Sequence, residues 1–142
     1  MNTTLAFILI VILVGGTIWI YNHLIKLRNM VAEGLSAIDV QLLRRANLIP
    51  NLEQAVKGYM GHERALLTEI AELRARSREA RGVGDKAEAE MGLSKALAGL
   101  VAVAESYPDL KANQNFLALQ RELSDIEDQI QMARRYYNGT VR

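Results

Sequence analysis

The sequence has 142 residues, the length of one ordinary domain, and 50% of them are hydrophobic while only 6% are aromatic. Its 17 basic and 16 acidic residues leave a net charge of +1, too little for the strongly basic face that nucleic-acid binding requires. The chain contains no cysteine, which excludes disulfides, thiolate metal sites and thiol catalysis.

The N-terminal segment is uncharged from its start to Asn22. A helix needs about 20 predominantly apolar residues to cross the hydrocarbon core of a bilayer. The sequence therefore predicts a transmembrane anchor over residues 1–22, whose span includes Leu5, Ile10, Val14, Trp19 and Tyr21.

A cleaved signal peptide is the alternative interpretation, but it needs a basic start and small residues at the cleavage site. This chain opens with Met-Asn-Thr-Thr, and Trp19 and Tyr21 stand where small residues would be required. Both fit the aromatic belt of a retained anchor, and Lys26 and Arg28 follow them. Because basic residues flank only this side, the positive-inside rule predicts an outside N-terminus and a cytoplasmic domain, residues 23–142, at the cell (inner) membrane.

A single apolar seam follows the anchor, with residues recurring at steps of three and four. The spacing is close to the 3.5-residue period of a coiled coil. No Pro, Gly or Ser cluster separates Tyr21 from Leu24, so one helix is expected to leave the membrane directly. The seam consists of Leu24, Leu27, Val31, Leu35, Ile38, Leu42, Ala46, Ile49, Leu52, Val56 and Tyr59.

Pro50 lies inside this seam, where it lacks an N–H and crowds the carbonyl of Ala46 at a cost of about 3 kcal/mol. The apolar phase continues across it, which favours a kink over a loop. Asn47 is expected to act as an N-cap that places Pro50 in a first helical turn. The basic side chains of Arg44 and Arg45 are expected to reach the freed carbonyls. The alternative is a phosphate or lipid site.

Three more helices are expected after Gly58 and Gly61. The first starts near His62 and carries on one face Leu66, Leu67, Ile70 and Leu73. A turn at 82–85 separates it from a helix at about 86–106 with the seam residues Met91, Leu97, Leu100, Val101 and Ala104. Tyr107-Pro108 ends that helix, and the last one, at about 111–138, carries Phe116, Leu119, Leu123, Ile126, Ile130, Ala133 and Tyr137.

Short turns between helices favour antiparallel neighbours. The predicted fold is therefore all-α, an N-terminal transmembrane helix followed by an antiparallel bundle of about four long helices.

No residue pattern indicates a catalytic, cofactor or metal site. His62-Glu63 begins like the zinc motif HExxH, but Leu66 stands where the second histidine should be. A run of carboxylates in the last helix could exchange protons, but a solvated face balanced by Arg121 and Arg134 explains it better. This run comprises Glu122, Asp125, Glu127 and Asp128. We expect no enzyme, no cofactor and no metal.

Four arginines form the one basic cluster that suits lipid or partner contact, namely Arg74, Arg76, Arg78 and Arg81. Contact with anionic lipid contributes about 1 kcal/mol per basic residue near the surface. Glutamates interleave with the cluster at 69, 72 and 79, which favours an ordinary solvated face.

Three long motifs in this chain resemble the LemA family closely, in the family's order and spacing. They are YNHLIKLRNMV, SAIDVQLLRRANLIPNLEQAVKGYMGHE and ESYPDLKANQNFLALQRELSDIEDQIQMARRYYN. The resemblance implies a short N-terminal membrane anchor, a cytoplasmic bundle of about four helices and no enzymatic activity. Some relatives are associated with building magnetosome membranes. The family usually continues past the Tyr-Asn motif into a further helical stretch with an Ile-x-x-Phe-Pro-like segment, which does not follow here. We therefore expect the last helix and its end to differ from the family's pattern.

Two functional hypotheses follow. The first is a membrane scaffold that self-associates into a homo-oligomer, because a helix at about 86–106 is too short to cover the seam from Leu24 to Tyr59. Its partners would be other copies of itself, the lipid bilayer and other membrane proteins, without nucleic acid. The alternative is a protein that remodels or senses membranes by binding anionic lipid through its basic helix faces.

Overall fold

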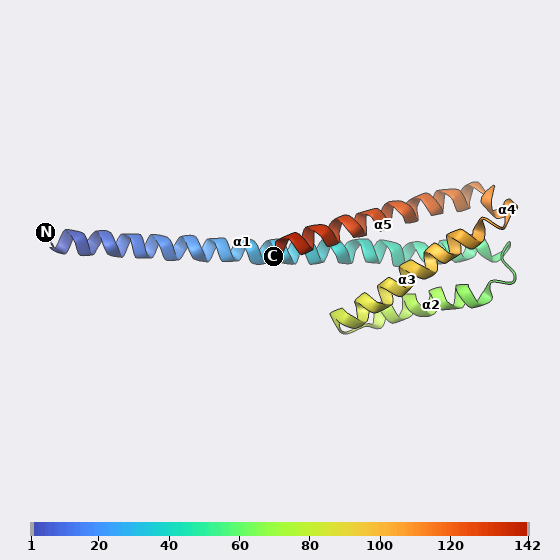
Figure 1. Cartoon of the computed structure of the whole chain (residues 1–142), viewed down its shortest axis with the longest axis horizontal. Helices are drawn as coiled ribbons and strands as arrows, with labels where there is room; N and C mark the ends of the chain where they lie inside the picture. Colours follow the sequence, from blue (N-terminus) through green and yellow to red (C-terminus); the bar gives the residue numbers. More distant parts are fainter. Residues whose placement is uncertain (1, 142) are drawn as a thin grey trace. The chain divides into compact units, whose positions relative to one another are not determined.

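The computed structural model describes residues 2–141, and all of its regular elements in that range are helices (Figure 1). They are α1 (Asn2–Lys57), α2 (Arg64–Glu79), α3 (Val83–Ala104), the single turn α4 (Pro108–Lys111) and α5 (Gln114–Thr140). The chain divides into two compact units, one formed by Met1–Gln41 with Gln129–Arg142 and the other by Leu42–Asp128. The predicted all-α fold is confirmed.

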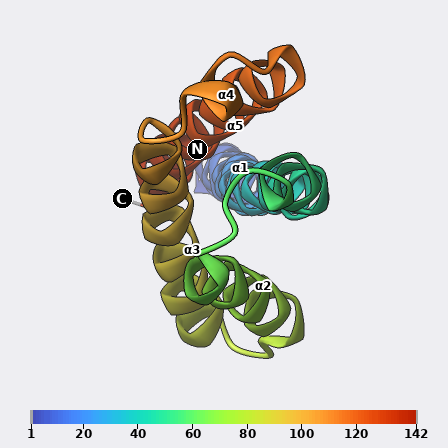
Figure 2. The same cartoon turned by 90° about the vertical axis from the view of Figure 1, so that its right-hand side faces the viewer.

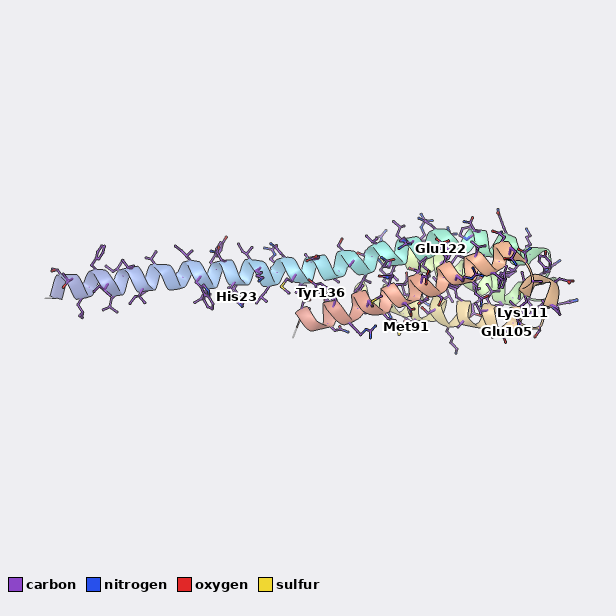
Figure 3. All side chains as sticks on the ribbon, turned by 90° about the horizontal axis from the view of Figure 1, so that it is seen from above. His23, Met91, Glu105, Lys111, Glu122 and Tyr136 are labelled. Atoms are coloured by element: carbon purple, nitrogen blue, oxygen red, sulfur yellow. The ribbon has the colours of Figure 1, made fainter. Side chains whose placement is uncertain are left out.

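In the first unit, the end of α5 packs closely against α1. Gly34 of α1 is buried, and a Cβ there would lie 3.2 Å from the Cα of Tyr137 and 3.3 Å from Cδ1 of Tyr136. The Tyr136 hydroxyl donates to Glu33 across 3.4 Å (Tyr136 is labelled in Figure 3). Only a residue without a side chain fits this contact without displacing a neighbour.

The start of α1 is long and apolar enough to cross a membrane, and none of its most apolar window is buried by the rest of the chain. Phe7 and Leu13 are 69% and 71% exposed. Such a continuous apolar surface exceeds what soluble monomers leave in water. Length and composition of α1 thus meet the requirements of a membrane span.

The second unit contains the hydrophobic core. All five helices contribute to it, α1 only with its part from Leu42 onward. Each fully buried Leu or Ile contributes about 1.5–3 kcal/mol relative to exposure. The largest apolar side chains of this core are Ile49, Leu52, Val56, Met60, Ile70, Leu93, Leu97, Leu100, Leu110 and Ile126. The predicted seam is buried in this unit from Leu42 to Val56, whereas its last residue, Tyr59, lies beyond the end of α1 and is 39% exposed.

The earlier part of the same seam is only partly covered, since Val31 and Ile38 are half-buried. Leu24, Leu27 and Leu35 are 59%, 39% and 42% exposed. The seam therefore changes from exposed to buried along one continuous helix, although its sequence period does not change.

Two boundaries differ from the sequence prediction. The turn expected at 82–85 is shorter, because Gly82 adopts the extended backbone that precedes a helix and α3 starts at Val83. Asp85 then lies in the first turn, where the helix dipole favours an acidic residue.

The last predicted helix begins later than expected, and a separate helical turn precedes it. Pro108 starts the separate turn α4, and the Asn113 side chain accepts hydrogen bonds from the N–H groups of Asn115 (2.9 Å) and Phe116 (3.1 Å). Asn113 is thus the N-cap of α5, which explains why this helix begins at Gln114 and not near Lys111.

Met91 is a wrong core assignment. Its side chain is 60% exposed, and Leu93 takes the core position instead. The helix α3 is apolar on most of its circumference, so its sequence contains too little contrast to fix which face is inward.

Candidate functional site

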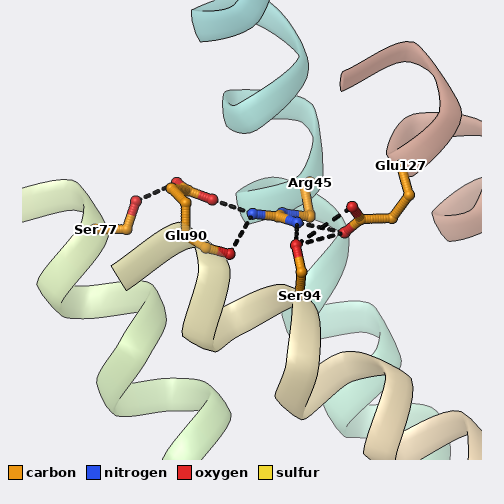
Figure 4. A network of polar contacts seen from close by, with 5 residues as sticks. All are labelled: Arg45, Ser77, Glu90, Ser94 and Glu127. Atoms are coloured by element: carbon orange, nitrogen blue, oxygen red, sulfur yellow. Dashed lines mark hydrogen bonds and ion pairs between the residues drawn. The ribbon is translucent and has the colours of Figure 1, made fainter. Parts of the chain in front are cut away.

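The second unit holds a buried polar network centred on Arg45 (Figure 4). Arg45 of α1 is completely buried, and Glu90 of α3 is 3% exposed. The network also includes Ser77 of α2, Ser94 of α3 and Glu127 of α5. It therefore ties together the four long helices.

The guanidinium of Arg45 is shared between two carboxylates. Nη2 donates to the side chain of Glu90 and also to its backbone carbonyl, at 3.3 Å. Nη1 donates to the hydroxyl of Ser94 and to Glu127. Ser77 donates to the second oxygen of Glu90, and Ser94 lies 3.3 Å from Glu127 Oε2. Arg45 Nε has no hydrogen-bond partner among the described residues.

One cation and two carboxylates in this space leave a formal charge of −1. The side chain of Glu127 is 29% exposed, so water reaches the second carboxylate, whereas Glu90 depends on Arg45 and Ser77. Removing one partner from a buried ion pair costs about 3–5 kcal/mol, because the other charge stays buried. Both carboxylates are engaged by Arg45 and the Ser77 hydroxyl is buried, so the arrangement suits the clamping of helices better than proton transfer.

A second polar contact satisfies the backbone carbonyl that Pro50 leaves without a helical hydrogen bond. The helix α1 continues through this proline without a loop, as predicted, and Asn47 lies inside the helix and does not form the expected N-cap. Arg74 Nε donates to the carbonyl oxygen of Ala46 at 2.8 Å. This is the carbonyl that Pro50, four residues later, cannot bond. Arg44 and Arg45 were both expected to reach such carbonyls, but Arg74 donates to this one and Arg45 turns into the core.

The basic cluster is only partly available for other ligands. Arg74 is half-buried, and Arg76 forms an exposed ion pair with Glu88 at 3.1 Å. Arg78 and Arg81 are exposed. The contact of this cluster with lipid or a partner stays a prediction.

The Arg45 network was missed at the sequence level, although a signal for Arg45 itself exists. Leu42, Arg45, Ala46 and Ile49 are spaced as neighbours on one helical face, so the seam already places Arg45 toward the core. Its partners are more than 30 residues away, at 77, 90, 94 and 127, and no local pattern connects them.

A groove of about 860 Å³ opens between α1 and α2 on the surface of this unit. Pro50, Gln54 and Lys57 line one wall, and Arg64, Leu67, Thr68, Ala71, Glu72 and Ala75 line the other. Glu53 also faces the groove, and its Oε1 is shielded from solvent with no hydrogen-bond partner among the described residues. Within residues 2–141, no group of three or more His, Asp or Glu side chains is placed to hold a metal ion.

Comparison with known proteins identifies one family. A model of the LemA family matches residues 34–142, which include the whole Arg45 network and every residue that lines the α1–α2 groove. A search of curated proteins found no match.

Proposed function

Because this chain belongs to the LemA family, whose members are not known as enzymes, we propose that it is a membrane-anchored helical scaffold that self-associates into a homo-oligomer. The observation that carries this proposal is the uncovered part of the α1 seam, where Leu24, Leu27 and Leu35 are exposed. Apolar surface in a 3.5-residue repeat is stabilised when another helix covers it, by about 25 cal/mol per Å².

The apolar start of α1 supports a membrane anchor. Trp19 stacks on His23 with ring centroids 5.5 Å apart, at the end of the uncharged run, and Lys26 and Arg28 follow. Aromatic rings and then basic residues are typical of the cytoplasmic side of a span. In this proposal the N-terminus lies outside the cell membrane and the helical bundle lies in the cytoplasm.

An anchor also favours assembly without any added contact. Copies held in one membrane share one orientation and one plane, which raises their effective concentration. Identical chains with a common orientation form closed rings most simply about an axis along the membrane normal. Leu27 and Leu35 would then face a neighbouring copy near the membrane.

The lipid-sensing alternative has less support from the side chains. Arg74 is bonded to the backbone of α1, and Arg76 is paired with Glu88, so two of the four arginines already have partners within the chain. The scaffold interpretation needs no free basic face.

The test compares two leucine variants in the full chain extracted in mild detergent. Leu27→Gln combined with Leu35→Gln makes the exposed seam polar, and we expect a smaller particle by native mass spectrometry. Leu43→Gln is the matched control, since Leu43 is also on α1 and is 58% exposed but lies off the seam. Equal particle masses for the two variants and the unaltered chain would contradict a role for the seam in assembly.

A further inference from the structure

The groove between α1 and α2 and the outer face of α3 fit each other in position, size and charge. We infer that the α1–α2 groove of one copy holds α3 of the next copy, an inference that rests on the proposed homo-oligomer. The surface on α3 is called here the outer stripe and comprises Met91, Lys95, Ala98, Ala102 and Glu105.

The outer stripe is an exposed helical face with a regular spacing. All five residues are exposed and recur at steps of three and four, and Glu105 directly follows the last residue of α3. Met91 and Glu105 lie along the same edge of α3 in Figure 3. Within this unit, α1 and α2 lie on one side and α3 on the other (Figure 2). The stripe and the groove therefore belong to different helices of the unit.

Small side chains on both surfaces permit close approach. The α2 wall of the groove carries Thr68, Ala71 and Ala75 at helical spacing, and the middle of the outer stripe consists of Ala98 and Ala102. Packed helices lie 8–10 Å apart, with the shorter distances at small residues. Small side chains in the middle of both surfaces thus allow the two helices to approach closely.

Contacts within the chain show that the two surfaces cover the same part of the bundle. At one end, Arg45 bonds to Ser94 and Arg74 bonds to the carbonyl of Ala46, so Lys95 and Glu72 both lie near that level. At the other end, the Tyr107 hydroxyl donates to Glu63 at 3.4 Å, which places Glu105 near Arg64 in level. If neighbouring copies are related by a rotation axis parallel to the helices, residues at the same position along that axis face each other, as this pairing requires.

The charges complement each other only in one direction. With α3 parallel to the α1 of its host, Lys95 meets Glu72 and Glu105 meets Lys57 and Arg64. The reversed direction would bring Glu105 to Glu72 and Lys95 to Arg64, which repel. Anchors in a common membrane impose the parallel direction, because every copy then points the same way. None of these five side chains takes part in the ion pairs formed among the described residues.

Glu53 supplies a further reason for a cation in the groove. One of its carboxylate oxygens is shielded from solvent and receives no hydrogen bond from the described residues. A partly desolvated carboxylate is stabilised by a nearby positive charge. Lys95 of the neighbouring copy would bring that charge between Glu53 and Glu72.

This contact joins two different surfaces, so it is of the head-to-tail type. Such an interface continues from copy to copy and forms a ring when the rotation closes.

The lack of native cysteine allows a direct test by disulfide formation between two differently tagged full-length chains made in the same cells, with copper phenanthroline added to the isolated membranes as the oxidant. One chain carries Ala71→Cys in the groove and the other Ala98→Cys in the outer stripe. We expect a disulfide between these two cysteines, detected as a cross-linked product that carries both tags. The matched control replaces Ala98→Cys by Glu122→Cys, an exposed position on α5 that lies a few residues from Glu127 and so at a similar level. This control pair is expected to give no disulfide.

Charge reversal in the same pair tests the direction of packing. Lys95→Glu in the outer-stripe chain is expected to reduce the disulfide severalfold, and adding Glu72→Lys to the groove chain is expected to restore it. Both side chains are exposed, so the fold should be retained, and circular dichroism checks this. A multi-chain particle in which the Ala71→Cys and Ala98→Cys chains cross-link no more than the control pair overturns the inference and leaves the proposed function standing. A particle of single-chain mass overturns both.

Discussion

Arg45 shows how one buried charge can organise a helical bundle. Its guanidinium reaches α3 and α5 directly, and α2 through the hydroxyl of Ser77 on Glu90. A hydrophobic residue in its place would make no directional contacts, whereas the guanidinium needs its acceptors at defined positions on α3 and α5. The network therefore favours the helix packing that brings these acceptors to Arg45.

Removing this cation should destabilise the chain strongly. We predict that Arg45→Met lowers the free energy of unfolding of the bundle by about 3–5 kcal/mol, because Glu90 stays buried without its partner. Urea unfolding in detergent, followed by circular dichroism, measures the change. The double variant Arg45→Met with Glu90→Leu should recover part of the loss, because it also removes the unpaired carboxylate. Unfolding of Arg45→Met at the same urea concentration as the unaltered chain would refute the clamp.

The contact between Arg74 and Ala46 predicts a coupling with Pro50. Arg74→Ala leaves a part-buried carbonyl without a donor and should cost about 1–3 kcal/mol. In a Pro50→Ala background the restored N–H of residue 50 can bond that carbonyl, so the loss from Arg74→Ala should be smaller. A double-mutant cycle on unfolding free energies measures the difference. Additive effects would mean that Arg74 does not substitute for the missing helical hydrogen bond.

At the scale of elements, sequence periodicity predicted the buried helix faces best where polar and apolar residues alternate clearly. The seam of α1 kept its phase through Pro50, and the helix is continuous there, whereas a bend at Pro50 stays a prediction. In α5 the predicted positions from Phe116 to Ile130 are buried. In α3, alanine and glycine surround the helix, so period alone could not separate the buried Leu93 from the exposed Met91. The Arg45 network escaped prediction because its five residues meet only after the helices pack.

The close approach of α5 to α1 at Gly34 gives a prediction for these elements. Gly34→Leu should separate the end of α5 from α1, since even a Cβ would lie 3.2 Å from the Tyr137 backbone. Amide hydrogen exchange of residues 129–141 should become faster. Gly139→Leu is the control, because nothing lies within 4 Å of a Cβ at that glycine. Unchanged exchange in Gly34→Leu would show that the two helices are not held by this contact.

At the scale of the whole molecule, the proposed anchor determines on which side of the membrane the bundle lies. With a cytoplasmic bundle, protease added to intact cells should leave the chain beyond Lys26 uncut, and permeabilised cells should lose it. The grounds are the uncharged N-terminal run and the basic residues that flank only its C-terminal side. Cleavage within the bundle in intact cells would reverse the proposed orientation.

The central claim is that the exposed part of the α1 seam is covered by other copies of the chain. Native mass spectrometry of the unaltered full-length protein, extracted from membranes in mild detergent, tests it most directly. The account predicts a particle that contains two or more chains of 15.8 kDa each, with the same number of chains across a range of protein concentrations. A particle of single-chain mass, under conditions in which the helical content is intact, would contradict it.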